Sequence, residues 1–187
     1  LRPLDDNIAK ECEVLFLALP HTTAMSKLPG YLQSDCKIID LSADYRLKDP
    51  KAYTDWYSVT HTHPELLKQA VYGLPELHRE AIQPAQLVAN PGCYPTSVIL
   101  ALAPLLNTDW VNLDSIISDS KSGVSGAGRK PSLTSHYAEV NEGVSPYGLA
   151  DHRHTPEMEQ ELSGLAGKSV RLTFSPHLIP MTRGMLS

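Results

Sequence analysis

The sequence has 187 residues, of which 42% are hydrophobic and 20% charged, and its formal net charge is −5 at pH 7. This composition is typical of a soluble globular protein, and the scattered basic residues of an acidic chain argue against a nucleic-acid-binding surface. The longest apolar runs, 14–19 and 98–106, fall far short of the ~20 residues that span a bilayer, and the start does not resemble a signal peptide. We therefore expect a cytoplasmic protein with neither membrane nor nucleic-acid partners.

The cysteines and histidines give little sign of a disulfide framework or a metal site. Cys12, Cys36 and Cys93 show no tight pairing pattern, and an odd, sparse set of cysteines fits a reducing cytosol better than disulfide bonding. His61 and His63 resemble a metal-binding pair, but no carboxylate or cysteine stands at a matching spacing. We predict that the chain holds no metal.

Three short apolar runs in the first half predict strands of a parallel sheet. Residues 13–19 form a nearly continuous apolar run, which is typical of a strand buried on both faces. Residues 37–41 and 87–90 form the second and third runs. Because helical segments separate such strands, the first half is predicted to be an α/β sheet.

The segments between these strands predict one crossover helix and one long excursion. Thr22 and Thr23 are suited to capping a helix that runs toward Tyr31. Residues 45–86 carry five of the twelve aromatic side chains and several prolines, so we expect them to be irregular but packed. In parallel sheets ligands bind at the carboxyl ends of the strands, which is where Pro20-His21 and Ser42-Ala43-Asp44 stand.

Residues 90–96 place one thiol between the third strand and a helix. Pro91 and Gly92 indicate a tight turn, and Pro95 suits the first turn of the helix, where its missing N–H has no intrahelical partner. Cys93 is therefore predicted at a helix N-terminus, where unpaired amides and the helix dipole favour the thiolate. Its alternative role is that of a small buried hydrophobic residue.

In the second half the predicted sheet changes character. Residues 114–120 alternate polar and apolar side chains, which is typical of a half-buried antiparallel strand. Residues 169–175 alternate in the same way, and a further strand follows Pro176 and the residues after it. We therefore expect an α+β region with antiparallel strands.

Two polar segments of this half are candidates for chemistry. Residues 121–130 contain three glycines, hydroxyl groups and three basic residues, so the loop could direct backbone N–H groups and Arg129 toward a phosphate or carboxylate. It could also be a plain flexible loop. Asp151-His152-Arg153-His154-Thr155-Pro156-Glu157 precedes a short helix, with Thr155 as its N-cap. On an extended segment His152 and His154 would point to opposite sides, so at most one is expected to transfer protons near Cys93.

Five segments together resemble the N-acetyl-gamma-glutamyl-phosphate reductases, relatives of aspartate-semialdehyde dehydrogenase. They are Asp40-Leu41-Ser42-Ala43-Asp44-Tyr45-Arg46, Asn90-Pro91-Gly92-Cys93-Tyr94-Pro95-Thr96, Ser122-Gly123-Val124-Ser125-Gly126-Ala127-Gly128-Arg129, His152-Arg153-His154-Thr155-Pro156-Glu157 and Phe174-Ser175-Pro176-His177-Leu178-Ile179-Pro180. They follow the family's order and cover nearly the whole chain. The resemblance implies a partial Rossmann-like, NADP-binding domain over residues 1–96, ending at the catalytic cysteine, and part of an α+β catalytic and dimerisation domain over 97–187.

The resemblance also implies the chemistry and the residues that perform it. An acyl phosphate is reduced to an aldehyde with NADPH through a thioester on Cys93, and His152 is the acid/base residue, with His154 as second choice. Contacts with substrate or phosphate are expected from Arg46, Ser122, Arg129 and His154, and contacts with the cofactor from Pro20, Ser42, Gly123 and Gly126. A homo-oligomer, dimer or tetramer, is expected for the full-length protein.

One departure from the family pattern stands out. The Gly-rich first turn that holds the NADP pyrophosphate in the family has no counterpart before Glu13, and the family's C-terminal strands and closing helix are also missing. We therefore expect a central piece of a longer enzyme. Two alternatives remain: a related reductase that takes acetylaminoadipyl phosphate, which is one methylene longer, and a hydrolase in which Cys93 and His152 act with water.

Overall fold

A computed structural model describes residue 5 and residues 7–187. The chain forms two compact units that divide between Gly92 and Cys93. The predicted boundary after residue 96 falls inside the first turn of α5 (Cys93–Leu102), a helix that belongs to the second unit. Among the described residues, none of the helices combines the length and the apolar character of a membrane span.

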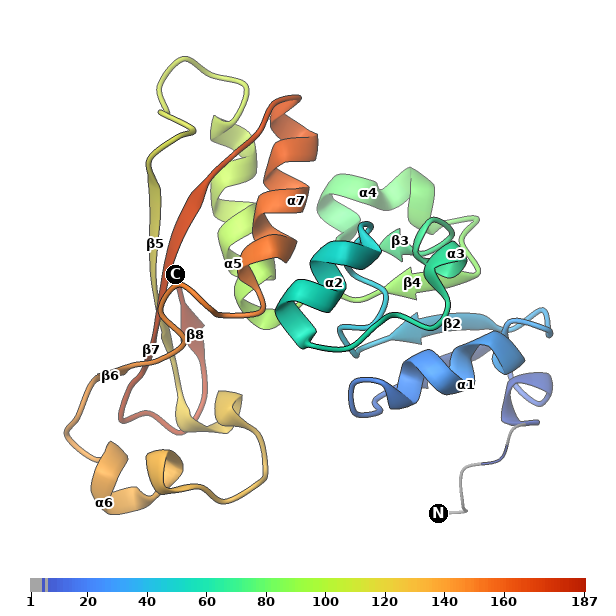
Figure 1. The fold of residues 1–187 in the computed structure, drawn as a ribbon, viewed down its shortest axis with the longest axis horizontal. Coiled ribbons are helices and arrows are strands. Elements are labelled where there is room, and N and C mark those ends of the chain that lie inside the picture. The colour runs from blue at the N-terminus through green and yellow to red at the C-terminus, as the bar shows by residue number, and fades with distance from the viewer. Residues whose placement is uncertain (1–4, 6) are drawn as a thin grey trace. The chain divides into compact units, whose positions relative to one another are not determined.

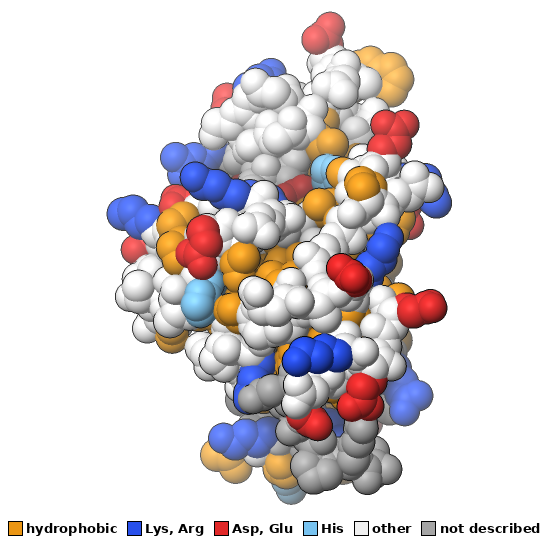
Figure 2. Space-filling view, turned by 90° about the vertical axis from the view of Figure 1, so that its right-hand side faces the viewer, with side chains coloured by type: hydrophobic (Ala, Val, Ile, Leu, Met, Phe, Trp, Pro, Cys, Tyr) orange, Lys and Arg blue, Asp and Glu red, His pale blue; other side chains and the backbone are white. Residues whose placement is uncertain are grey.

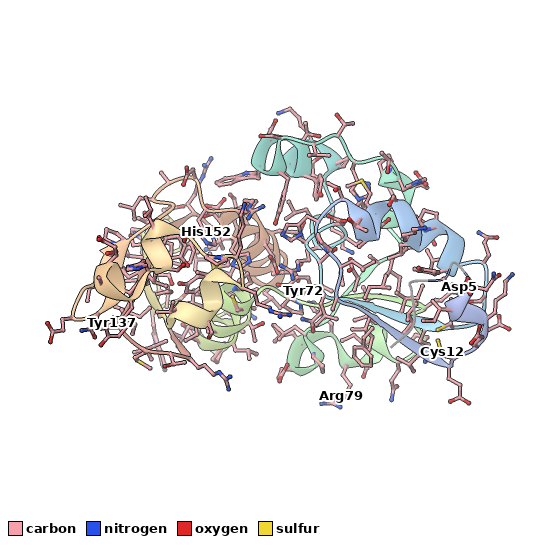
Figure 3. All side chains as sticks on the ribbon, turned by 90° about the horizontal axis from the view of Figure 1, so that it is seen from below. Asp5, Cys12, Tyr72, Arg79, Tyr137 and His152 are labelled. Carbon is pink, nitrogen blue, oxygen red and sulfur yellow. The ribbon has the colours of Figure 1, made fainter. Side chains whose placement is uncertain are left out.

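The first unit is built on a parallel four-stranded sheet, as predicted. Its strands lie in the order β1 (Val14–Leu17), β2 (Lys37–Asp40), β4 (Leu87–Ala89) and β3 (Val71–Tyr72). α1 (Thr23–Tyr31) lies on one face of this sheet and α4 (Pro75–Ile82) on the other (Figures 1 and 3). On the face shown in Figure 2, acidic and basic side chains are interspersed around apolar atoms.

The prediction that the first strand is buried on both faces is wrong. β1 is the edge strand of the sheet, with 44% of Val14 and 64% of Phe16 exposed. Leu17 is buried, and it packs into a core with Ile38 of β2 and Leu28 of α1. A continuous apolar run indicates a strand, but it cannot show how many of its faces are covered.

The long segment between β2 and β4 is more regular than predicted. It contains α2 (Pro50–Tyr57), α3 (Pro64–Leu67), β3 and α4. Each of the three helices begins with a proline. In the first turn of a helix proline costs nothing, since its missing N–H has no intrahelical partner there. The prolines that suggested irregular structure are therefore helix starts.

α1 is capped by a residue that is distant in sequence. Thr22 takes a left-handed conformation (φ 70°) and makes no side-chain cap. The buried carboxylate of Asp44 accepts instead, from the backbone N–H groups of Thr22 (2.8 Å) and Met25 (2.9 Å). The hydroxyl of Tyr53 donates to the same carboxylate, at 2.8 Å. The predicted threonine cap is thus replaced by a carboxylate from the loop after β2.

The second unit holds a mixed sheet. β5 (Ile116–Ser122) and β7 (Leu172–Leu178) pair in parallel, and the short strands β6 (Ser145–Pro146) and β8 (Met185–Leu186) pair with them antiparallel at the two edges. The prediction of antiparallel strands is wrong for the central pair, because a crossover containing α7 (Thr155–Ala166) connects β5 to β7. Pro176 lies within β7 rather than between two strands.

Two helices cover one face of this sheet and form its core. α5 and α7 lie side by side, with α7 against β7 and α5 against β8 (Figure 1). Met158 and Leu162 of α7 and Phe174 of β7 are buried between these elements. β5 alternates as predicted, with Ile116 buried and 73% of Ile117 exposed. The remaining short helices are Ile8–Lys10, Ala103–Leu105, Val124–Ala127, Leu133–Ser135 and α6 (Tyr137–Val140).

Candidate functional site

Cys93 is an exposed thiol at the first residue of α5. β4 ends at Ala89 and α5 begins at Cys93, so the predicted order of strand, turn and helix is confirmed. Pro95 lies in the first turn, where it leaves no hydrogen bond unmade. The dipole of this ten-residue helix favours negative charge beside its first residue, Cys93.

Tyr94, the next residue, is buried among the side chains that surround the start of α5. Its hydroxyl hydrogen-bonds that of Tyr147 at 2.9 Å, and its ring centroid lies 5.7 Å from that of His152 and 6.0 Å from that of His154. Burial raises the pKa of Tyr94, while hydrogen bonds with Tyr147 and Ser122 act in the opposite direction. The predicted residues Ser122, His152 and His154 are thus brought together around the neighbour of Cys93.

The imidazole of His152 is held in one orientation and one tautomer. Its Nδ1 accepts the backbone N–H of His154 at 3.1 Å. Because a backbone N–H can only donate, Nδ1 carries no proton, and the neutral ring bears its proton on Nε2. Burial, and then the charge of Arg153, lower the pKa of His152 to about 4. At neutral pH, His152 is therefore an uncharged hydrogen-bond donor through Nε2. The residue is labelled in Figure 3.

The prediction that the two histidines face opposite sides is wrong. Their ring centroids lie 4.9 Å apart and both rings contact Tyr94. Residues 151–154 form a turn rather than an extended segment, and His154, not Thr155, is the N-cap residue of α7, with φ −81° and ψ −15°. Gly148 (φ +56°) lies against this turn, and a Cβ there would stand 3.2 Å from Cδ2 of His152.

The amides of the glycine-containing loop are used within the second unit. The N–H groups of Gly123, Val124 and Ser125 donate to the backbone carbonyls of Gly184, Met181 and Thr182, and that of Gly126 donates to Gly123. These amides are therefore not directed at a ligand.

At each of the two glycines predicted to bind the cofactor, other atoms of the chain come close to the position that a Cβ would occupy. A Cβ at Gly123 would lie 2.9 Å from the backbone of Arg183. A Cβ at Gly126 would collide with Oγ of Ser122. Cofactor binding by Gly123 and Gly126 stays a prediction, and Gly123 is required by packing in any case.

The basic residues of the same loop line an open cavity. Arg129 and Lys130 are exposed, and with His136, Tyr137 and Met181 they border a cavity of about 650 Å³. Tyr137 lies at the outer edge of the second unit (Figure 3). Two cations beside hydroxyl and imidazole groups suit an anion such as a phosphate or carboxylate.

In the first unit, Arg46 and Ser42 are buried and engaged with their own loops. The guanidinium of Arg46 donates from Nε to the Asn90 carbonyl (2.7 Å) and from Nη2 to the Leu41 carbonyl (2.9 Å). It therefore connects the segments that follow β2 and β4. The hydroxyl of Ser42 donates to the carboxylate of Asp40 at 2.8 Å. Pro20 is exposed at the carboxyl end of β1.

Sequence reasoning missed a buried polar network at this edge of the sheet. Asp40 and Asp44 are fully buried, and burial raises the pKa of Asp40 against the opposing hydrogen bonds from Ser42. His61 donates from Nε2 to the Asp44 carbonyl (2.9 Å), and its Nδ1 accepts the N–H of His63 (3.1 Å). Runs of short polar residues after a buried strand are the signal that could have indicated it.

The histidines that resembled a metal pair have structural partners. His61 belongs to the buried network, and His63 pairs with Glu65 at 3.3 Å. Within the described part of the chain, no three His, Cys, Asp or Glu residues are placed to hold a metal ion.

Comparison with protein-family models covers both units. Residues 1–85 match the semialdehyde dehydrogenase NAD-binding domain, and residues 93–187 match the semialdehyde dehydrogenase dimerisation domain. The chain belongs to the semialdehyde dehydrogenase family. The boundary between the two matches coincides with the structural division before Cys93.

Among curated members of this family, the chain is similar to several N-acetyl-gamma-glutamyl-phosphate reductases. It is 57% identical over 185 residues to that of Syntrophobacter fumaroxidans, covering 99% of this chain and 54% of the relative. It is 58% identical over 181 residues to that of Geotalea daltonii, covering 96% of this chain and 52% of the relative. The chain thus spans about half the length of the curated relatives it matches.

Solved semialdehyde dehydrogenases share the fold. Aspartate semialdehyde dehydrogenase II from Vibrio cholerae superimposes with a TM-score of 0.67 at 14% identity, covering 95% of this chain and 54% of that one. The Candida albicans enzyme, whose structure contains NADP, gives 0.57 at 12% identity, covering 94% and 49%. At these identities the likeness concerns the fold alone.

Proposed function

We propose that the natural protein carrying these residues reduces N-acetyl-gamma-glutamyl phosphate to N-acetylglutamate semialdehyde and phosphate, as the names of its relatives state for them. This reaction belongs to arginine biosynthesis. The main observation behind the proposal is the exposed thiol of Cys93 at the N-terminus of α5. The next residue, Tyr94, contacts the ring of His152. An acyl phosphate needs a nucleophile that can form and release a thioester, and a thiolate at a helix N-terminus supplies one.

The proposed covalent step takes place on Cys93. Its thiolate attacks the acyl carbon and phosphate leaves, which gives a thioester. Reduction at the same carbon gives a thiohemiacetal, whose collapse releases the aldehyde and regenerates the thiolate. Arg129 and Lys130 are proposed to bind the phosphate group of the substrate. Both are exposed and line the open cavity described above.

His152 is proposed to act on the oxygen of the acyl group. Its neutral ring carries the proton on Nε2, so it can donate a hydrogen bond to the oxyanion that develops during thiolate attack. To accept a proton at Nε2, the ring would first have to release the N–H of His154 from Nδ1. Ser122 and His154 both contact Tyr94, the neighbour of Cys93, and this supports substrate contacts by both residues. Arg46 as a substrate ligand stays a prediction.

The first unit fits part of a nicotinamide dinucleotide site. Pro20 and Ser42 stand at the carboxyl ends of β1 and β2, where dinucleotides bind in such sheets. The amides of Thr22 and Met25 at the start of α1 already donate to Asp44, so they do not offer the pyrophosphate the donors that a helix N-terminus usually provides. When bound, NADPH supplies the hydride; we propose NADP over NAD from the family resemblance.

The decisive experiment is the reverse assay on the natural protein. N-acetylglutamate semialdehyde and phosphate are supplied with NADP, and NADPH formation is followed by its absorbance. We expect turnover that requires all three, and slower turnover with the substrate that is one methylene longer. A Cys-His hydrolase would instead be indicated if the acyl phosphate, supplied in the forward direction, were converted to free acid and phosphate without any need for NADPH. Light scattering on the same preparation tests the homo-oligomer, a dimer or tetramer, that the dimerisation-domain match suggests.

A further inference from the structure

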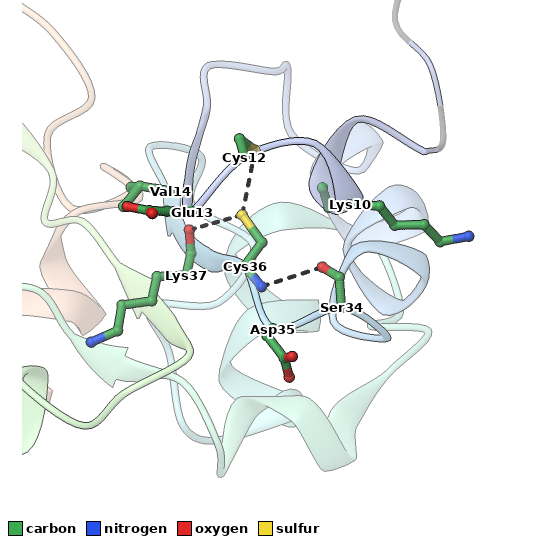
Figure 4. Close-up of a pocket in the computed structure, with 9 residues that line it drawn as sticks. Lys10, Cys12, Glu13, Val14, Ser34, Asp35, Cys36 and Lys37 are labelled. Carbon is green, nitrogen blue, oxygen red and sulfur yellow. Dashed lines mark hydrogen bonds between the residues drawn. The ribbon is translucent and has the colours of Figure 1, made fainter.

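Two thiols lie in contact at the amino ends of adjacent strands in the first unit. Cys12 and Cys36 are 24 positions apart in sequence, and their Sγ atoms are 3.5 Å apart (Figure 4). Cys12 precedes β1 and Cys36 precedes β2, and the backbone N–H of Lys37 donates to the Glu13 carbonyl at 2.9 Å. Strand pairing therefore holds the two cysteines together. The spacing of the cysteines in the sequence did not predict this contact.

The two sulfurs differ in their access to solvent. An open cavity of about 590 Å³ is lined by both cysteines and by Lys10, Glu13, Asp35 and Lys37. Cys12 is half-buried, whereas Cys36 is only 2% exposed. A small molecule entering this cavity would therefore meet the Cys12 sulfur first, with the Cys36 sulfur directly behind it.

We propose that Cys12 and Cys36 form a dithiol–disulfide site that takes a small-molecule disulfide, such as glutathione disulfide, as its oxidant. The Cys12 sulfur attacks one sulfur of the oxidant, which breaks the oxidant's S–S bond and releases one thiol with the proton of Cys12. Cys36 then attacks the Cys12 sulfur of the mixed disulfide and releases the second thiol. The two cysteines together lose two electrons, and the oxidant gains them.

The order of these two steps follows from burial and protonation. Burial, and then the neighbouring Cys12, raise the pKa of Cys36 to about 11, so at neutral pH its thiol is protonated and a poor first attacker. As the resolving thiol it needs no access to solvent, because its target is already in contact. Bond formation requires the sulfurs to approach from 3.5 Å to about 2.05 Å. The S–H contact of Cys12 with the Ile8 carbonyl, at 3.3 Å, is then given up.

The test is thiol titration of the full chain after equilibration with glutathione disulfide. Free thiols are blocked with a maleimide after denaturation, and the digest is mapped by mass spectrometry. We expect one linked peptide joining Cys12 to Cys36 in the wild-type chain, whether or not the exposed Cys93 also forms a glutathione adduct. Cys93→Ser should give the same linked peptide.

Single variants distinguish the proposed order. Cys36→Ser should accumulate a glutathione adduct on Cys12, which in wild type should stay below about a tenth of that level because a neighbouring thiol reacts intramolecularly. Cys12→Ser should form neither adduct nor link at Cys36. A stable adduct on wild-type Cys12 without a linked peptide, or retention of all three thiols, would overturn the proposal. The wild-type map alone decides between these outcomes if a variant fails to fold.

Discussion

At the scale of single residues, the most informative side chain is Cys93. It is exposed, whereas Cys36 is buried and Cys12 half-buried. A nucleophile must be reachable as well as ionised, and only Cys93 combines exposure with the amides of a helix N-terminus. This contrast gives the proposed mechanism its first test.

Cys93→Ser in the natural protein should abolish reduction, because a hydroxyl does not supply the anion that attacks the acyl phosphate. We expect kcat to fall by on the order of 10³-fold or more. Steady-state turnover with NADPH measures this loss, and Cys12→Ser serves as the control that keeps activity. A Cys93→Ser enzyme with more than about a tenth of wild-type activity would exclude a thioester at this position.

The two histidines should differ in importance although they lie together. His152→Asn removes the Nε2 donor and should lower kcat by about 10²–10⁴-fold. His154→Asn should cost about tenfold or less, because the group that orients His152 is the backbone N–H of residue 154, which the substitution retains. Comparing kcat for the two variants tests this. A larger loss in His154→Asn would transfer the role to that ring.

Gly148 is expected to position His152. Ala at residue 148 places a Cβ 3.2 Å from the imidazole and occupies a φ of +56°. Gly167 has a similar φ of +65° with no atom near its would-be Cβ. Both alanine variants should lose about 1–2 kcal/mol of stability from the left-handed backbone, but only Gly148→Ala should lower kcat. Equal kcat in the two variants would show that His152 is positioned without Gly148.

The residue types and their order were predictable from sequence, whereas their contacts were not. Cys93 at a helix start followed from the local turn chemistry of Pro91, Gly92 and Pro95. The mutual contact of His152 and His154 did not, since it depends on a turn that sequence reasoning read as extended. The contact between Cys12 and Cys36 depends on the pairing of β1 with β2, which α1 connects. No local sequence pattern indicates which strands pair.

At the scale of elements, the sequence predicted the main strands and the helices α1, α5 and α7, but neither α2, α3 and α4 nor how the elements are joined and capped. Apolar runs located β1, β2 and β4, and alternation located β5. Strand direction in the second unit was missed, since alternation reports one covered face and is silent on whether the neighbouring strand runs parallel.

Asp44 is expected to be the main support of the start of α1. Asp44→Asn keeps the shape but replaces one acceptor oxygen by an amide donor, so at least one of three donors is left unsatisfied in a buried site. A buried unsatisfied donor costs about 1–3 kcal/mol. Urea unfolding measures the loss of stability.

The same substitution at an exposed cap provides the control. Asp49 caps α2 by accepting the Lys51 N–H at 2.8 Å, and it is exposed. Because Asn and Asp are about equally good N-cap residues, Asp49→Asn should be nearly neutral. Equal losses in the two variants would show that Asp44 contributes only as an ordinary cap.

At the scale of the whole molecule, buried titratable groups should limit stability at both ends of the pH range. On the alkaline side the pKa of Cys36 is raised to about 11 from 9.0, chiefly by burial. The folded state therefore retains a proton that the unfolded chain loses. This contribution to stability is fully present below about pH 9 and is lost as the pH rises through about 11.

On the acid side His152 should dominate in the second unit. Its pKa is lowered from 6.5 to about 4, first by burial, so between these values the unfolded chain binds a proton that the folded chain excludes. Stability is thus fully present above pH 6.5 and falls toward pH 4. Burial lowers the pKa of His61 as well, which adds to the fall in the same direction from the first unit.

Calorimetric unfolding of wild type and His152→Gln between pH 4 and pH 7 tests this reasoning. Glutamine does not titrate, so the variant should lose less stability on acidification than wild type, whatever its stability at pH 7. The slope with pH is compared, rather than the melting temperature itself, because the substitution also alters packing against Tyr94 and Phe174. The exposed His136 provides the matched control, His136→Gln. If wild type and His152→Gln lose stability in parallel on acidification, protonation of the half-buried His152 ring does not determine the acid limit, and other groups do.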